Sequence, residues 1–436
     1  MHNDRVVQLE QTPRSRSKLL LLGVLLLVAL SMLAYRGLYR GFTAGTDFGL
    51  YYCSTIAMIQ TGDPYSPEPL RELAEQRGAP TNAIENAIAP PVCYTPLLPF
   101  AAMPWEAARA LWVLINLLAV FMLWYWLAGL AQIPRSHLSL STLGLAAIVA
   151  GFAPLQTNIA YGQLAVTASA SIIGSIAFAQ QGRTRTAAVL FVLGGLLKPQ
   201  LAIGFCLYWL YKREWRLLGY TACYGLGITL LTLGWLQIKN PMWYEAWQGN
   251  IQRLASGGGA SDYARTASFI FSDLRVPLYV ILQSRLLAAA LAWVVTIGLG
   301  VLACTRVRLR PTKHRHKDAG NALHDLRAAG MIACLGMLPI YHVYYDTTIL
   351  LLPAAWAIAI YAKNRAWPAL LILLMIVPML VPGQPLLHYL EGKGFLPGPL
   401  VATPFYRGFV LQHLPWLTIG IFLCLLAHRQ AENPVE

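Results

Sequence analysis

Apolar runs of about 20 residues recur along this 436-residue chain, and few folds can accommodate them. Each run is long enough to cross a bilayer as one helix. Only 12% of the residues are charged and 57% are hydrophobic, whereas a soluble domain carries about a quarter charged residues. We find no short alternating strands of the kind that a membrane β-barrel requires. The sequence therefore predicts an all-α polytopic membrane protein: an enzyme, a transporter or a channel.

The basic residues indicate how the chain is oriented. The net charge of +14 comes largely from Lys and Arg in short loops on one side, as the positive-inside rule describes, so we predict no nucleic-acid partner. The N-tail (1–18) and the C-tail (429–436) are predicted to be cytoplasmic, and residues 19–428 to form one domain in the cytoplasmic (inner) membrane. About 11 or 12 transmembrane helices are expected, with two long outward loops that carry interfacial helices. The outward loops are predicted at about 36–106, 237–277 and 383–408.

Most carboxylates fall on the predicted outward side, and one of them directly follows the first apolar run. This is Asp47, in the segment GTDFGLYYCSTIAMIQTGDPYSP (45–67). If the segment is helical, Asp47, Tyr51 and Ser54 share a polar face beside an apolar face that contains Phe48 and Tyr52. A carboxylate at a membrane surface among aromatic residues suits a reaction between lipid-carried substrates. Alternatively, Asp47 is only a helix N-cap.

A second unusual feature is the Lys198-Pro199 pair inside an apolar region. The basic residues that flank this region, Arg185 and Lys212, both fall on the cytoplasmic side, yet too few residues lie between them for two full spans. Two short helices that meet at Lys198 would resolve the conflict. Non-helical backbone at membrane depth is tolerated where it lines a cavity, and an intramembrane Lys is a functional candidate. Alternatively, Lys198 snorkels beside a proline kink.

Other polar and aromatic residues are predicted to converge on the same outward side. Tyr94 lies in the proline-rich run PPVCYTPLLPF, which we expect to form an interfacial hairpin, and Gln163 lies in a short outer segment. Arg265 belongs to the second long loop. His342 and Tyr345 lie in PIYHVYYD at the end of a helix pair, although His342 can also be a hydrogen-bonded core histidine. We predict that Tyr51, Tyr52, Tyr94, Gln163, Lys198, Arg265, His342 and Tyr345 bind substrate.

This set of residues suits the transfer of a sugar from a lipid phosphate. The carboxylate of Asp47 would take the proton of an acceptor hydroxyl, cations would stabilise the developing phosphate charge, and aromatic faces would hold the sugar. The seven cysteines show no metal-type spacing. Cys53 and Cys93 both fall in the first outward loop, where a disulfide could form in an oxidising compartment.

Several motifs in order resemble glycosyltransferase family 87, in the membrane C-type superfamily. They are DFGLYYCSTIAMIQTGDPY from Asp47, YTPLLPF from Tyr94, YGQ at 161–163, GGLLKPQ at 194–200 and YHVYYD with His342. The resemblance covers roughly residues 40–360 and implies a C-type glycosyltransferase fold. It also implies an inverting enzyme whose donor is a polyprenyl-phosphate sugar such as mannose, and whose acceptor is a lipid-linked glycan or a polysaccharide.

The resemblance assigns the general base to Asp47, and donor-phosphate contacts to Lys198 and His342. Phe48 and Gly49 follow Asp47, so the Asp-x-Asp motif of metal-dependent relatives is missing from this loop. We therefore predict no metal and no other cofactor. The expected partners are the polyprenyl-phosphate sugar, the glycan acceptor and membrane lipid.

Two other functions stay open at this stage. A flippase or transporter of lipid-linked sugars would also use an internal cavity with Lys198 and tyrosines. A polymerase or ligase that uses a pyrophosphate-linked donor would need more cations, and Arg253, Arg265 and Arg275 could supply them.

Overall fold

The protein is helical throughout the part of the chain that the structure describes. A computed structural model describes residues 13–135, 139–255, 262, 270–306, 319–381 and 383–428. These residues form no β-strand, only an isolated antiparallel bridge between Phe271 and Val343. The predicted all-α fold class is confirmed.

The helices of the first half, with the 3-10 and π segments marked η, are α1 (Pro13–Met32), η1 (Leu33–Tyr39), α2 (Arg40–Thr43), α3 (Thr46–Gln60), α4 (Pro67–Arg77), η2 (Ile84–Asn86), η3 (Pro91–Ala102), α5 (Trp105–Leu130), α6 (Leu140–Gly151), α7 (Ala153–Tyr161), α8 (Ala165–Gln180), α9 (Thr184–Leu197) and α10 (Pro199–Tyr211). Those of the second half are α11 (Trp215–Lys239), α12 (Trp243–Ala255), α13 (Arg275–Leu282), α14 (Arg285–Arg306), α15 (Ala319–Met337), η6 (Tyr344–Leu350), α16 (Leu351–Asn364), α17 (Trp367–Leu380), α18 (Gly383–Gly392), α19 (Gly398–Val401), η7 (Tyr406–Leu411) and α20 (His413–Ala427).

Several helices are long and apolar enough to cross a membrane. Five qualify alone among the described residues, or up to seven if each of two bent helix pairs counts as one span. The five are Arg16–Gln60, Trp105–Leu130, Trp215–Lys239, Arg285–Arg306 and Tyr344–Asn364. Three further apolar helices, α8, α9 and α20, are shorter. The chain is thus a multi-pass membrane protein. The number of 11 or 12 spans stays a prediction, since five to seven spans qualify among the described residues.

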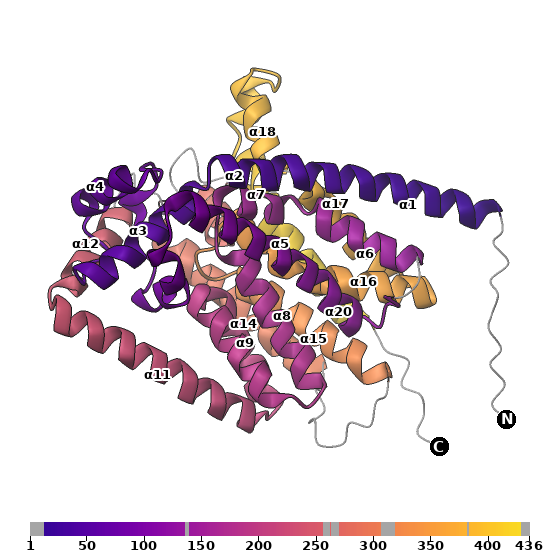
Figure 1. The fold of residues 1–436 in the computed structure, drawn as a ribbon. Helices are drawn as coiled ribbons and strands as arrows, with labels where there is room; N and C mark the ends of the chain where they lie inside the picture. Colours follow the sequence, from indigo (N-terminus) through magenta and orange to yellow (C-terminus); the bar gives the residue numbers. More distant parts are fainter. Residues whose placement is uncertain are drawn as a thin grey trace.

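Helices α1, η1, α2 and α3 make one long helical stretch along the side of the bundle (Figure 1). Side chains of α1 such as Leu20 and Leu27 are exposed, as expected for a helix that faces lipid. α1 packs on α6, and η1 packs on α7. This stretch delivers α3 to one end of the bundle, where α3, α4 and α12 gather; we call this end the α3 end.

Helix α8 lies at the centre of the bundle, between α5 and α9. Its sequence, AVTASASIIGSIAFAQ, is rich in Ala, Ser and Gly, and 12 of its 16 residues are buried. Small residues let helix backbones approach closely in a membrane bundle. At Gly194 of α9, an added Cβ would lie 2.8 Å from Ile172 of α8, so the two helices meet without room for a side chain.

The chain breaks between α9 and α10 at Lys198, as the sequence predicts. Pro199 has no amide hydrogen to continue the helix, and it disfavours helical dihedrals at the residue before it. Lys198 accordingly has φ −146° and ψ 80°. Its amide ends α9 by donating to the oxygen of Gly194 (2.9 Å), and its carbonyl begins α10 by accepting from Leu201 (3.1 Å). Helix α10 then packs along α15.

The first predicted outward loop is compactly folded. The charged stretch 67–77 forms α4, and the proline-rich run forms the 3-10 helix η3 around Pro96 and Pro99 where we expected a hairpin. Asp63 accepts hydrogen bonds from the backbone N–H groups of Tyr65 (3.0 Å) and Ser66 (3.2 Å), which fixes the turn after α3. From the second loop, α12 docks on this structure, because Asn250 donates to the carbonyls of Tyr65 and Ala87, both at 2.9 Å.

Candidate active site

Asp47 lies in the first turn of α3 and is half-buried. The N-cap of α3 is Gly45, and no side chain caps the helix, so the alternative role of Asp47 as an N-cap is wrong. The helix dipole places partial positive charge at this first turn, next to the carboxylate. Asp47 and Tyr51 lie one turn apart on α3, as the helical periodicity predicts.

An aromatic cluster fixes α3 beneath Asp47. Phe48 is fully buried and stacks on Trp105 (ring centroids 5.9 Å apart) and Trp112 (5.2 Å), both in α5. Phe100 of η3 meets the ring of Phe48 edge-on at 5.4 Å. Such pairs add about 0.5–1.5 kcal/mol each beyond their burial. The carboxylate is therefore held on a rigid support.

Gln163 joins Asp47 to Tyr51. Its Nε2 donates to Oδ2 of Asp47 at 2.6 Å, and its Oε1 accepts from the Tyr51 hydroxyl at 3.2 Å. The preceding Gly162 has φ 72°, and a Cβ there would lie 2.6 Å from Cβ of Phe48. Only glycine allows the chain to turn this close to α3 and place Gln163 beside the carboxylate.

A buried amide network supports Gln163 from below. Nδ2 of Asn158 donates to Oδ1 of Asn116 and to the carbonyl of Gln163, both at 3.1 Å. Oδ1 of Asn158 accepts from the Val166 backbone N–H at 3.2 Å. Asn116 and Asn158 are fully buried. Because polar groups in an apolar interior need partners, these bonds fix the turn that carries Gln163.

A second charged group lies beside the first, around the break at Lys198. The Lys198 ammonium lies 3.2 Å from Oδ1 of Asp346. Oδ2 of Asp346 accepts from the Val343 backbone N–H (3.2 Å) and faces Nδ1 of His342 (3.4 Å), whose Nε2 faces the carbonyl of Gly336 (3.0 Å). His342 and Asp346 are fully buried. His342 is thus hydrogen-bonded within the core, as its alternative role proposed.

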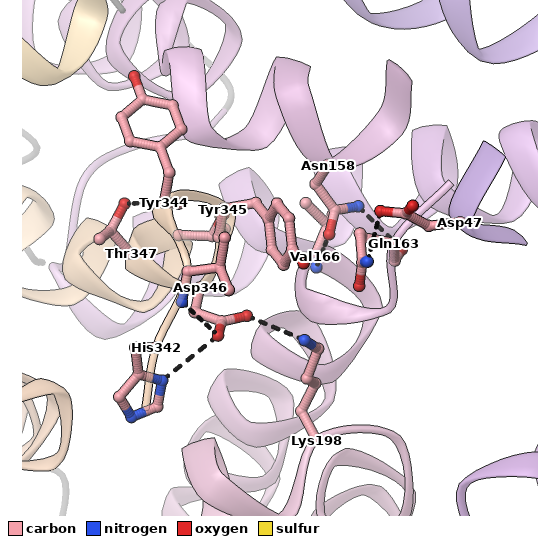
Figure 2. A network of polar contacts seen from close by, with 12 residues as sticks. Asp47, Asn158, Gln163, Val166, Lys198, His342, Tyr344, Tyr345, Asp346 and Thr347 are labelled. Atoms are coloured by element: carbon pink, nitrogen blue, oxygen red, sulfur yellow. Dashed lines mark hydrogen bonds and ion pairs between the residues drawn. The ribbon is translucent and has the colours of Figure 1, made fainter. Parts of the chain in front are cut away.

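Tyr345 lies between the two groups (Figure 2). The Lys198 ammonium lies 5.0 Å from the centre of the Tyr345 ring. Tyr51 and Tyr345 are each within electrostatic range of both Asp47 and Asp346, and Lys198 is within such range of Asp47. The structure therefore brings Asp47, Gln163, Lys198 and Asp346 into one site, although they come from four separate segments.

A short clasp holds the His342 segment in place. The backbone N–H of Ser272 donates to the carbonyl of His342 (3.0 Å), next to the bridge between Phe271 and Val343. Oδ2 of the buried Asp273 accepts from the His342 N–H (3.5 Å), and Oδ1 of Asp273 accepts from Nε of Arg275 (2.8 Å). The end of the second long loop is thus tied to the segment that carries Asp346.

The remaining predicted residues have varied surroundings. The buried Tyr52 donates its hydroxyl to the carbonyl of Met103 (2.7 Å). Tyr94 is also fully buried. Arg265 lies outside the described residues, so its predicted contact with substrate stays a prediction. Cys53 and Cys93 are both free and buried, and burial raises the pKa of the Cys93 thiol to about 12.

A comparison with protein families indicates which class of enzyme this site belongs to. The sequence model of glycosyltransferase family 87 matches residues 88–339, more than half of the chain. The chain belongs to glycosyltransferase family 87. It is therefore a membrane glycosyltransferase, as predicted. No curated protein and no solved structure matches this chain.

The residues matched by the family model contain only part of the candidate site. Gln163 and Lys198 lie within the matched residues of this family 87 glycosyltransferase, whereas Asp47, His342 and Asp346 lie beyond its two ends. Their place in the site therefore rests on geometry: the hydrogen bond from Gln163 to Asp47 and the ion pair from Lys198 to Asp346 tie both outer segments to the matched core.

Sequence reasoning missed three residues that shape the site of this glycosyltransferase. Asp346 could have been found from its position four residues after His342. Asn116 is an amide in the middle of an apolar span, where polar residues are rare and mark functional positions. Asp273 has no comparable signal, because its bond to the His342 backbone joins segments that are far apart in sequence.

Proposed function

We propose that this glycosyltransferase transfers a hexose, mannose in the first instance, from a polyprenyl-phosphate donor to a lipid-linked glycan or polysaccharide. The observation that carries the proposal is a carboxylate with one free oxygen beside a buried cation. Oδ2 of Asp47 is held by Gln163, whereas Oδ1 receives no hydrogen bond from the described residues. Lys198 lies within electrostatic range on the neighbouring helix break.

In this mechanism Asp47 acts as the general base. Oδ1 of Asp47 accepts the proton of an acceptor hydroxyl as that oxygen bonds to the anomeric carbon of the sugar. The bond from the anomeric carbon to the phosphate oxygen breaks, and the polyprenyl phosphate leaves from the opposite face. The anomeric centre is thereby inverted. Gln163 and Tyr51 keep the carboxylate oriented for this transfer.

Lys198 is proposed to stabilise the charge that develops on the leaving phosphate. Its ammonium has three hydrogens, so it can keep its ion pair with Asp346 and still donate to a phosphate oxygen. The fully buried His342 acts through Asp346, which it helps to hold, rather than by touching the donor. Arg265 is proposed as a further phosphate contact from the second long loop.

The same proposal fixes the orientation of the chain. The basic short loops are cytoplasmic, together with both termini, and the site opens to the outer face of the inner membrane. A donor that stays anchored by its polyprenyl chain explains why the catalytic carboxylate lies at the end of a long apolar helix.

The test is sugar transfer by purified protein in nanodiscs, with polyprenyl-phosphate mannose and a panel of glycolipid acceptors. Asp47→Asn is expected to lower kcat about 10²–10⁴-fold, because the amide cannot accept the proton. Glu106→Gln is the matched control, since Glu106 is an exposed carboxylate on α5, next to α3, and pairs with Arg109 of the same helix. Wild-type transfer is expected to persist with a chelator present.

Other outcomes would redirect the proposal. Transfer that survives Asp47→Asn would show that another group is the base. Transfer abolished by the chelator would refute the metal-free mechanism. Tight donor binding without turnover, equal in wild type and variant, would instead favour a transporter of lipid-linked sugars.

A further inference from the structure

Two arginines precede Asp47 on the same helical stretch and have no carboxylate partner. Arg36 lies in η1 and is half-buried, whereas Arg40, which begins α2, is exposed. The two guanidinium groups lie within electrostatic range of each other. Neither forms an ion pair or a side-chain hydrogen bond with the described residues. Arg40 has a cation–π contact, with its guanidinium 5.8 Å from the centre of the Tyr161 ring. A partly buried cation in this state favours an anionic ligand.

Close helix packing fixes the backbone that carries both arginines. Gly37 and Gly41 lie four residues apart and face α7. An added Cβ would lie 3.6 Å from Cα of Gln156 at the first glycine and 2.8 Å from the Ile159 carbonyl at the second. Small residues at this spacing let two helices meet backbone to backbone. Segment η1 is also a π-helix, an irregularity that is frequent at functional sites.

Tyr344 gives an independent indication of a ligand. This residue is 4% exposed, and its buried hydroxyl has no hydrogen-bond partner among the described residues. It lies within electrostatic range of Arg36. Figure 2 shows its ring directed away from Lys198 and Asp346. A buried hydroxyl without a partner costs about 1–3 kcal/mol, which an acceptor oxygen of a ligand would recover.

The depth of the arginines in the bilayer identifies the ligand. From Lys18 to Arg36 the helix rises about 27 Å at 1.5 Å per residue. The hydrocarbon core of a bilayer is about 30 Å thick. A helix whose first end lies at one membrane surface therefore places Arg36 and Arg40 at the phosphate layer of the other surface.

We propose that Arg36, Arg40 and Tyr344 bind the phosphodiester of a lipid beside the Asp47 site. The two guanidinium groups neutralise the phosphate, and the Tyr344 hydroxyl donates to one of its oxygens. The lipid is either a bilayer phospholipid or the phospholipid anchor of a glycolipid acceptor. Only the second source rests on the proposed function. This site is separate from the donor-phosphate contact assigned to Lys198.

The first test measures lipid binding and needs no transferase activity. Native mass spectrometry in neutral detergent would give the affinity of the first bound phosphatidylglycerol, with diacylglycerol as the probe that lacks phosphate. We expect Arg36→Gln to weaken phosphatidylglycerol binding about tenfold and Tyr344→Phe about threefold, and diacylglycerol to bind weakly in every case. Arg109→Gln, which removes an arginine already paired with Glu106, should bind like the wild type.

Two results would overturn the proposal. One is wild-type affinity in both Arg36→Gln and Tyr344→Phe, the second of which removes only a hydroxyl group and tests the site even if the first variant folds poorly. The other is equal retention of diacylglycerol and phosphatidylglycerol.

A second measurement distinguishes the two sources. In nanodiscs of neutral lipid, an anchor site predicts that Arg36→Gln raises KM for a phospholipid-anchored acceptor about tenfold with kcat unchanged. A bilayer-lipid site predicts an unchanged KM alongside the loss of phosphatidylglycerol binding. If the proposed transfer fails altogether, the binding experiment still stands by itself.

Discussion

Helix α10 carries a buried lysine at each end, and each lysine pairs with an aspartate. Before the first turn, Lys198 lies 3.2 Å from Asp346, and after the last turn, Lys212 lies 3.0 Å from Asp325 of α15. The two pairs are alike in chemistry and differ in surroundings. Lys198 lies at the break between α9 and α10. The Tyr345 ring lies over its ammonium, and Asp47 is within electrostatic range.

The Lys212 pair is enclosed more completely. Both of its side chains are 2% exposed, against 10% for the Lys198 side chain. Gln180 donates to Asp325 at 3.5 Å, and the Lys212 ammonium lies 5.5 Å from the centre of the Tyr208 ring. We infer that the Lys212 pair holds α10 against α15, whereas the Lys198 pair remains accessible to substrate. A buried ion pair is therefore not in itself a sign of catalysis.

The largest expected effect is on stability. Lys212→Met leaves the carboxylate of Asp325 buried without its cation, which costs about 3–5 kcal/mol of folding stability. Thermal unfolding in detergent, followed by tryptophan fluorescence, should show a clearly lower Tm. The double variant Lys212→Met/Asp325→Leu should recover most of it, because no charge remains unpaired. A normal Tm together with lost transfer would contradict the structural role.

The next effect is on the reaction. Lys198→Met should lower kcat/KM about 10²–10³-fold, because a cation that stabilises transition-state charge is lost. Tm should fall less than in Lys212→Met, since Asp346 keeps the Val343 N–H and His342. Lys198→Arg, which retains the charge, should recover part of the activity. Equal losses of Tm and of activity in both lysine variants would contradict the different roles of the two ion pairs.

The smallest effect compares two glutamines that contact carboxylates. Gln163→Leu removes the hydrogen bond to Asp47 and should lower kcat about tenfold, in line with about 1.5 kcal/mol for a bond to a charged group. Gln180→Leu removes the corresponding contact with Asp325 and should leave kcat within about twofold of the wild type. Similar kcat values in these two variants would contradict the assignment of roles.

Much of the fold could be predicted because membrane helices have strong local signals. Long apolar runs, prolines and basic loops predicted the helical class and the break at Lys198. The site was partly predictable for the same reason. A carboxylate directly after an apolar run stands out, as does a lysine inside one, and motif order brought Gln163 into the same group.

The pairing of these residues could not be predicted. Asp346 lies four residues after His342, yet nothing in the local sequence indicates that it pairs with Lys198. That contact depends on how α10 packs along α15. For the same reason the clasp at Asp273 was missed. The proline-rich run was assigned to a hairpin because prolines exclude an α-helix, but a 3-10 helix also tolerates Pro96 and Pro99.

The order of the two ion pairs along the chain has a consequence for biogenesis. Both lysines are synthesised before either aspartate, and more than a hundred residues separate each lysine from its partner. At roughly 5–20 residues per second, several seconds or longer pass between the synthesis of α10 and that of Asp325 and Asp346. A chain truncated before α15 would lack both aspartates, so quality-control proteases should degrade such fragments selectively.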